Sequence, residues 1–278
     1  MAINGREAQQ HQLSYDKIIK HTLEQSDEMT IRFINGLFRD DISLDAPVEW
    51  LDKESVDGKY SAIVADFYPR VGGKMYAIEI EQDASGDMAV RVFRYTVGGA
   101  MLHGMAATKT QLNSAFPQPC VVFLTSTKNT PDELIWNIDF FDGQSVTLRV
   151  PAVRLSELSV KEIAERDLLP VGQFYLRKFE PLTDSKMGDF LEATKALLAE
   201  VRSAVDSETV LRHIGAQMEE TLLFDFVQYI QYMGAPTSEI GESGPHILIT
   251  RNGADTVVPS LVLEYRHFVV DFSPLRQQ

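Results

Sequence analysis

The sequence predicts a mixed α/β fold, with a mixed central sheet flanked by helices and a mainly helical C-terminal extension. The first supporting observation is the order of periodic segments up to residue 125, which runs helix, strand, hairpin, helix, strand. The second is the continuous apolar run at residues 120–124. A strand that is covered on both faces has such a run, whereas a strand with one exposed face alternates apolar and polar residues. The third is a hydrophobic content of 44% over 278 residues, which is enough for a sizeable core.

A helical region is predicted over residues 15–38. Ser26 followed by Asp27 and Glu28 restarts its second half, because a serine caps a helix and acids favour the positive end of the helix dipole. Apolar side chains recur at helical spacing at Ile18, Ile19, Leu23, Ile31, Ile34 and Leu37.

A short strand at residues 47–52 and then a β-hairpin are expected next. Residues 60–68 and 74–82 are rich in β-branched and aromatic side chains, and the Pro/Gly turn chemistry of residues 69–73 connects them.

Residues 87–111 have the pattern of a helix, although Gly98 and Gly99 lie inside it. Each glycine costs a helix about 1 kcal/mol relative to alanine, so the pair indicates close packing against a sheet or a neighbouring helix. An apolar strand is predicted at residues 120–125.

The later elements are two strands, a short helix and two long helices. We expect a first domain over residues 1–180 and a mainly helical region over 181–278, with a possible terminal β-hairpin around Asn252-Gly253. The predicted ranges are strands at 134–141 and 145–153, and helices at 160–166, 184–205 and 207–233.

Composition predicts a cytoplasmic protein with no membrane segment. No apolar run is long enough to cross a bilayer, and the start of the chain lacks the basic and apolar regions of a secretory signal. The single cysteine, Cys120, excludes an internal disulfide and a cysteine-based zinc site.

The formal net charge of −14 opposes tight binding to DNA, because neutralisation of phosphates drives that affinity. Residues 1–130 carry 13 Lys and Arg against 17 Asp and Glu, a net of −4, so −10 falls on residues 131–278. Acids of a metal site add to this negative charge and are neutralised by bound cations. The net charge therefore does not exclude a nuclease.

The most informative segment carries three acids on the two strands of the hairpin. Glu79 and Glu81 share one face of a strand, and Ile78 and Ile80 point to the opposite, core-facing side. Asp66 interrupts an apolar run near the end of the preceding strand, where a charge is costly unless it is paired or bound to a metal.

Convergence of these three carboxylates at the sheet surface would provide oxygen ligands for Mg²⁺ or Mn²⁺. Such cations activate water and offset charge during phosphodiester hydrolysis. The alternative is a solvated strand edge that carries charges against aggregation.

At these residues the chain resembles the recombination-promoting nuclease / putative transposase family of the PD-(D/E)XK nuclease superfamily. The matching pieces span roughly residues 14–180. They are Tyr15-Asp16-Lys17-Ile18-Ile19-Lys20, Phe33-Ile34-Asn35, Asp66, Gly72-Gly73, Ile78-Glu79-Ile80-Glu81, Arg91, Arg94-Tyr95, 121–124 and 151–170.

The resemblance implies an αβββαβ nuclease core and metal-dependent endonucleolytic cleavage of DNA. It assigns Asp66 and Glu79 as metal ligands, with Asp16 as a further candidate ligand from the first helix. Glu81 stands where the family usually has Gln and the superfamily Lys. The glutamate either favours a second cation or reduces activity, so a catalytically weakened DNA- or protein-binding module is the alternative function.

Cations after the motif are candidates for contact with the phosphate backbone, and solvated helix charges are the competing interpretation. Arg91, Arg94 and Lys109 lie on the predicted helix, and Tyr95 completes the expected DNA-binding set. Cleavage of both strands favours a symmetric homodimer.

Overall fold

The computed structural model describes residues 15–51, 67–84, 87–103, 105–180, 182–232, 247–250, 260–265 and 268–271. The chain divides into two compact units, Met1–Tyr229 and Ile230–Gln278.

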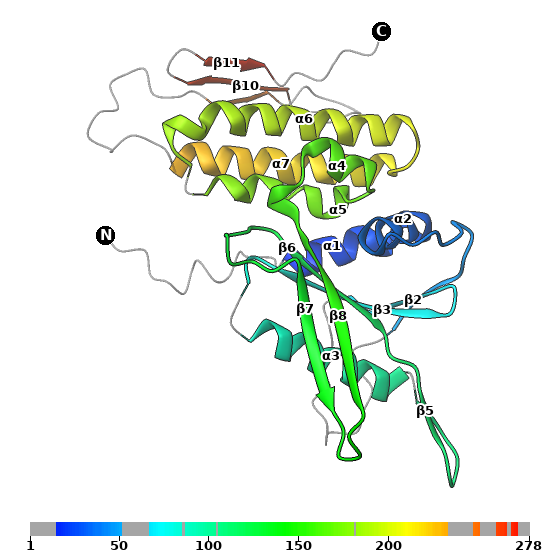
Figure 1. Cartoon of the computed structure of the whole chain (residues 1–278). Helices are drawn as coiled ribbons and strands as arrows, with labels where there is room; N and C mark the ends of the chain where they lie inside the picture. Colours follow the sequence, from blue (N-terminus) through cyan, green and yellow to red (C-terminus); the bar gives the residue numbers. More distant parts are fainter. Residues whose placement is uncertain are drawn as a thin grey trace, which may run out of the picture. The chain divides into compact units, whose positions relative to one another are not determined.

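A six-stranded mixed sheet forms the centre of the first unit (Figure 1), which confirms the predicted mixed α/β class. The parallel strands β3, β6 and β8 are neighbours, and the other pairs are antiparallel. In spatial order the strands are β1 (Val48–Trp50), β2 (Pro69–Val71), β3 (Lys74–Glu81), β6 (Gln118–Phe123), β8 (Ser145–Arg154) and β7 (Glu133–Asp139).

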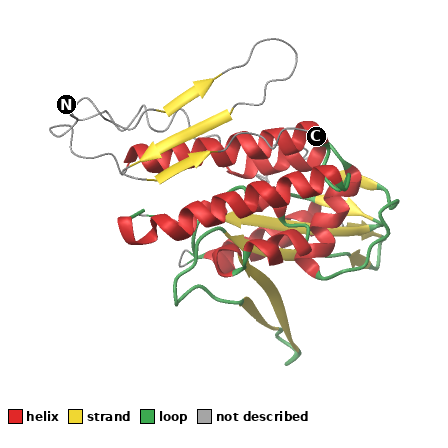
Figure 2. Cartoon of the chain, turned by 90° about the horizontal axis from the view of Figure 1, so that it is seen from above, coloured by secondary structure: helices red, strands yellow, loops and turns green. Residues whose placement is uncertain are grey.

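Helices cover both faces of this sheet. Figure 1 shows α3 on one face and α1 and α2 on the other, and Figure 2 shows helices lying over the strands from the second view. The helices are α1 (Tyr15–Glu24), α2 (Asp27–Phe38), α3 (Met88–His103), α4 (Val160–Glu165), α5 (Leu169–Gly172), α6 (Met187–Asp206) and α7 (Arg212–Tyr232), with short 3-10 turns η1 (Leu155–Glu157), η2 (Tyr175–Phe179) and η3 (Asp184–Lys186).

The core on the α3 side explains why α3 is amphipathic. Met88 and Val92 of the helix pack against Val121 and Phe123 of β6, and residues of β8 and of the edge strand β7 complete the cluster. The indole of Trp136 is held in place by a hydrogen bond to the α3 backbone. This packing ties the start of α3 to the carboxyl-terminal half of the central strands.

The predicted restart at Ser26 is confirmed. The Ser26 side chain accepts a hydrogen bond of 3.3 Å from the Met29 backbone N–H, and Asp27 and Glu28 occupy the first turn of α2. Arg39 ends α2 with a φ of 55°, in the left-handed region. Local cap chemistry therefore divides the helical region as expected.

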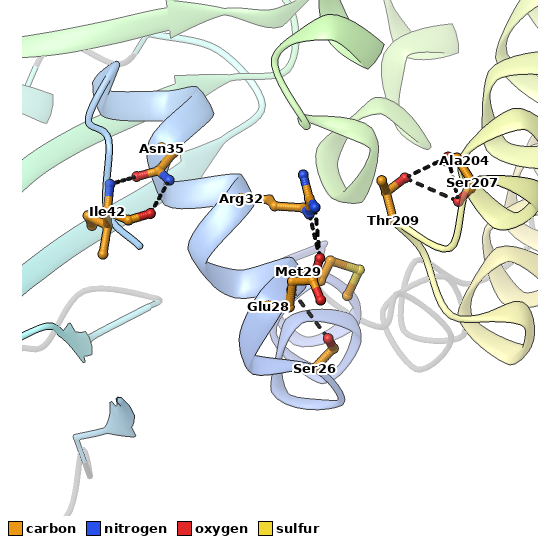
Figure 3. A network of polar contacts seen from close by, with 9 residues as sticks. All are labelled: Ser26, Glu28, Met29, Arg32, Asn35, Ile42, Ala204, Ser207 and Thr209. Carbon is orange, nitrogen blue, oxygen red and sulfur yellow. Dashed lines mark hydrogen bonds and ion pairs between the residues drawn. The ribbon is translucent and has the colours of Figure 1, made fainter. Parts of the chain in front are cut away.

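Asn35, one of the motif residues, fastens the loop after α2. Its amide donates to the Ile42 carbonyl and accepts from the Ile42 N–H, both at 2.9 Å (Figure 3). We expect Asn35→Ala to lower the free energy of unfolding by about 2 kcal/mol, because two hydrogen bonds to the backbone are lost. Urea unfolding measures this change. Asn137→Ala is the control. It loses one exposed hydrogen bond, from the Thr147 hydroxyl, and should lower the unfolding free energy by about 1 kcal/mol or less.

Residues 60–66 of the first predicted hairpin strand lie outside the described residues, and the described part of the hairpin differs from its prediction. Pro69–Val71 forms strand β2 rather than part of the turn, and the turn itself is confined to Gly72 and Gly73, with φ values of 56° and 84°. Only glycine adopts such angles at low cost, so the turn lies where the two glycines are.

The helix predicted over residues 87–111 is too long. α3 ends at His103, and residues beyond it form a small antiparallel hairpin of β4 (Met105–Ala107) and β5 (Leu112–Ser114). Thr108 accepts hydrogen bonds from the following backbone and closes the turn, which is the turn chemistry that competes with a helix. Lys109 therefore lies on a hairpin turn and not on a helix.

The close packing predicted at the glycine pair is confirmed for Gly99. A Cβ atom added at Gly99 would lie 2.0 Å from the hydroxyl oxygen of Tyr68, which precedes β2. The absence of a side chain lets α3 approach the sheet at this point.

The region after the sheet is helical in the first unit. α6 packs on α4, and an ion pair of 2.7 Å between Arg202 and Glu219 joins α6 to α7. The predicted boundary after residue 180 stays a prediction. Among the described residues, no helix is long and apolar enough to cross a membrane.

The second unit contains a three-stranded antiparallel sheet. Its spatial order is β11-β10-β9, and its strands are β9 (Ile247–Thr250), β10 (Ser260–Tyr265) and β11 (Phe268–Asp271).

Candidate functional site

Glu79 and Glu81 share the α3 face of β3. Glu79 pairs with Val121 and Glu81 with Phe123, and both of these β6 residues belong to the core beneath α3. Paired residues of neighbouring strands project to the same face, so the predicted alternation is confirmed.

The expectation that this face is the exposed surface of the sheet is wrong for Glu79. Glu79 is only 4% exposed, because β3 is an interior strand that is covered by helices on both faces. Burial of a carboxylate is costly unless a hydrogen bond, a counter-charge or a cation offsets it. The Glu79 carboxylate therefore lies where a ligand or a partner has a large energetic effect.

Glu81 lies at the end of β3, where the face begins to open. Its side chain is 24% exposed and forms an ion pair with the guanidinium of Arg91, from the first turn of α3. A weaker contact of 3.8 Å joins the Arg91 Nε atom to Asp87. The sequence did not indicate the pairing of Glu81 with Arg91. The contact of Asp87 with Arg91 has the i, i+4 spacing of a helical ion pair.

Burial raises the pKa of the Glu81 carboxyl above its ordinary value, against the attraction of Arg91, and the charges of Asp83 and Asp87 add to the rise. Burial is the largest single effect on the pKa of Arg91 and lowers it, but the charge and hydrogen bond of Glu81, together with the charges of Tyr95 and Asp87, outweigh burial and raise the pKa. Arg91 is therefore a permanent cation beside a carboxylate that is surrounded by further acids.

This shift predicts a pH dependence of stability. A carboxyl whose pKa is higher in the folded state makes the fold less stable as pH rises from its ordinary value, about 4.3, through the raised value. The free energy of unfolding of the wild type, minus that of Glu81→Gln, should therefore fall between pH 4 and 7. Urea titrations at several pH values measure it. A difference that rises with pH would contradict the expected sign.

Two of the predicted ligands cannot be placed in the site. Asp66 lies outside the described residues, and Asp16 lies in α1 with a side chain that is not described. The neighbour of Asp66 in sequence, Phe67, is bridged to Ile78, the neighbour of Glu79. No group of three or more His, Cys, Asp or Glu side chains suited to a metal ion occurs among the residues that are described. The convergence of three carboxylates stays a prediction.

The predicted DNA-binding residues lie in different surroundings. Arg94 is exposed on α3, whereas Tyr95 is partly buried against the cluster of Leu51, Tyr68, Met75 and Ala77. Lys109 is exposed on the β4–β5 turn. The structure thus brings Arg91 to the acidic motif, keeps Arg94 and Tyr95 on the same helix, and places Lys109 on a separate hairpin.

A second feature of the first unit is a pocket of about 290 Å³ between α2, α5 and the α6–α7 turn. Arg32, which is paired with Glu28 at 2.8 Å, lines this pocket together with Thr209 (Figure 3). Burial raises the pKa of Asp167 in its wall, against the attraction of Arg32. None of the predicted site residues lines this pocket, so it is separate from the acidic motif.

Neither a scan against protein-family models nor searches of curated proteins and solved structures finds a match for this chain.

Proposed function

We propose that this chain is a metal-dependent endonuclease that hydrolyses phosphodiester bonds in DNA, of the recombination-promoting nuclease type in the PD-(D/E)XK superfamily. The observation that carries the proposal is the buried carboxylate of Glu79, two residues before Glu81 on the same face of an interior strand. The αβββαβ core that the resemblance implies is matched by α2, β1, β2, β3, α3 and β6 in chain order, with α1 before them and the small β4–β5 hairpin inserted before β6.

Mg²⁺ or Mn²⁺ fits the donor set, because the motif offers only carboxylate oxygens. Glu79 and Asp66 would hold the cation, Asp16 is a further candidate ligand, and Glu81 would position water or a second cation. Phe67 and Ile78, which follow Asp66 and precede Glu79 in the sequence, form an antiparallel bridge, and this bridge supports the proposal. A bound divalent cation supplies an acidified water and offsets charge on the phosphate.

Arg91 provides the positive charge that a superfamily lysine would bring to the third motif position. Its guanidinium lies against Glu81 and the Arg91 side chain is 31% exposed, so an incoming phosphate can reach it from the open end of β3. In this role Arg91 binds the phosphate and the Glu81 carboxylate keeps it oriented. Arg94, Tyr95 and Lys109 would extend the contact with DNA, and a homodimer would cut both strands.

Cleavage of supercoiled and linear DNA with Mg²⁺ or Mn²⁺, against a control with EDTA, tests the proposal. Nicking that requires the metal and depends on Asp66 and Glu79 is the expected result. No cleavage with either metal, together with no binding of Mn²⁺ in calorimetry, would contradict both the endonuclease activity and the metal site.

A nuclease fold that has lost activity and binds DNA or protein is the second candidate. The observation that favours it is the Glu81–Arg91 ion pair at the position where the family usually has Gln, in a chain of net charge −14. Binding of Mn²⁺ at the motif without any nicking would support this candidate over the endonuclease.

A further inference from the structure

A polar pocket of about 450 Å³ lies where the three parallel strands end. Gln82 follows β3, Thr125, Ser126 and Thr127 follow β6, and Ser156 follows β8. Because β3, β6 and β8 are parallel, their carboxyl ends meet at one edge of the sheet, and ligands of open α/β sheets bind at such edges. Glu81 of the acidic motif is the last residue of β3 and adjoins Gln82.

The pocket is built by contacts between these strand ends. The N–H and the hydroxyl of Thr125 both donate to the Gln82 carbonyl, at 2.8 and 2.6 Å. The Ser126 and Ser156 hydroxyl oxygens are 2.6 Å apart. One hydroxyl of this pair donates to the other, which leaves the hydrogen of the accepting hydroxyl available to a ligand.

Two cations of η2, Arg177 and Lys178, and two acids, Glu157 and Glu180, also line this pocket. Both acids have a cationic partner. Arg177 is neutralised by Glu180 at 3.0 Å, and Arg154 neutralises Glu157 at 2.9 Å. The Lys178 ammonium instead donates to the Tyr175 hydroxyl at 2.6 Å and lies 4.2 Å from the centre of that ring. Within the part of the chain that the structure describes, no ion pair joins Lys178 to a carboxylate.

We propose that this pocket binds a phosphate group of a DNA strand, beside the acidic motif. This inference rests on the proposed function for the identity of the strand. Lys, Ser, Thr and Gln are the side chains that contact phosphate in protein–DNA complexes, and here they converge around one ammonium whose charge is not offset by a carboxylate. The pocket volume lies within the range of small-ligand sites, about 300–1,000 Å³, so a phosphate and part of its nucleotide fit.

Fluorescence anisotropy with a labelled DNA duplex in EDTA tests this inference without cleavage. Lys178→Met should weaken binding about tenfold, and it should reduce the slope of log affinity against log salt by about 0.9, the value for one phosphate contact. Lys178→Arg should restore most of the affinity. Lys161→Met is the matched control, because Lys161 is exposed and pairs with Glu165 outside the pocket. Its substitution removes the same positive charge from the protein.

Equal DNA affinity and an equal salt slope for the wild type and Lys178→Met would refute the binding of a DNA phosphate in this pocket. So would an equal loss in Lys161→Met, which indicates only a non-specific charge effect. A thermal unfolding midpoint within about 2 °C of the wild type ensures that the variant is folded. The two proposals fail separately. Tenfold weaker DNA binding by Lys178→Met, with no metal-dependent nicking by the wild type, would support the phosphate site and refute the endonuclease. Metal-dependent nicking by the wild type, with unchanged DNA binding by Lys178→Met, would support the endonuclease and refute the phosphate site.

Discussion

Glu79→Gln is expected to lower the rate of metal-dependent DNA cleavage at least about a hundredfold, because loss of one essential charged group in an active site typically has this effect. The substitution keeps the shape of the side chain and removes only its charge, at a position that is 4% exposed. Nicking of supercoiled DNA under single-turnover conditions measures the rate. Glu165→Gln, an exposed acid paired with Lys161 on α4, is the control and should cleave like the wild type.

A second readout separates metal binding from cleavage. Mn²⁺ at a hundred times its dissociation constant should raise the unfolding free energy of the wild type by about 2.7 kcal/mol, since ligand bound only to the folded state stabilises it. Glu79→Gln should show little of this increase. Equal stabilisation of both proteins by Mn²⁺ would contradict the assignment of Glu79 as a ligand, whatever the cleavage assay shows.

Gly36→Ala is expected to lower the free energy of unfolding by about 3 kcal/mol or more, the upper range for steric overpacking. Gly36 lies in α2, and a Cβ atom there would be 1.7 Å from the carbonyl oxygen of Arg166. The Arg166 guanidinium also donates to the Gly36 carbonyl, at 3.0 and 3.3 Å. Because the clash is with backbone on both sides, relief requires α2 and the end of α4 to separate.

Chemical unfolding in urea measures this loss. Gly188→Ala is a matched control in α6, where an added Cβ meets nothing within 4 Å. It should leave stability unchanged or raise it by up to about 1 kcal/mol, as alanine is the better helix former. A loss below about 1 kcal/mol in Gly36→Ala would show that the contact between α2 and Arg166 adapts easily.

Short-range patterns in the sequence determined much of the first unit. The cap at Ser26, the glycine turn at Gly72-Gly73, the apolar strand around Cys120 and the shared face of Glu79 and Glu81 were all predictable. Each of these depends on residues only a few positions apart, where backbone geometry leaves few options. The same local reasoning failed beyond His103, because the turn formed by Thr108 outcompetes the apolar spacing of a longer helix.

The tertiary structure alone decided how these elements meet. It buries Glu79 under α3, pairs Glu81 with Arg91, and brings the ends of β3, β6 and β8 together around Lys178. A strand with acids at alternate positions has the same pattern whether its second face meets water or a helix, so the sequence alone could not separate these cases. The order of strands in the sheet and the packing of α3 make that choice, because burial and charge pairing depend on residues that are distant in the chain.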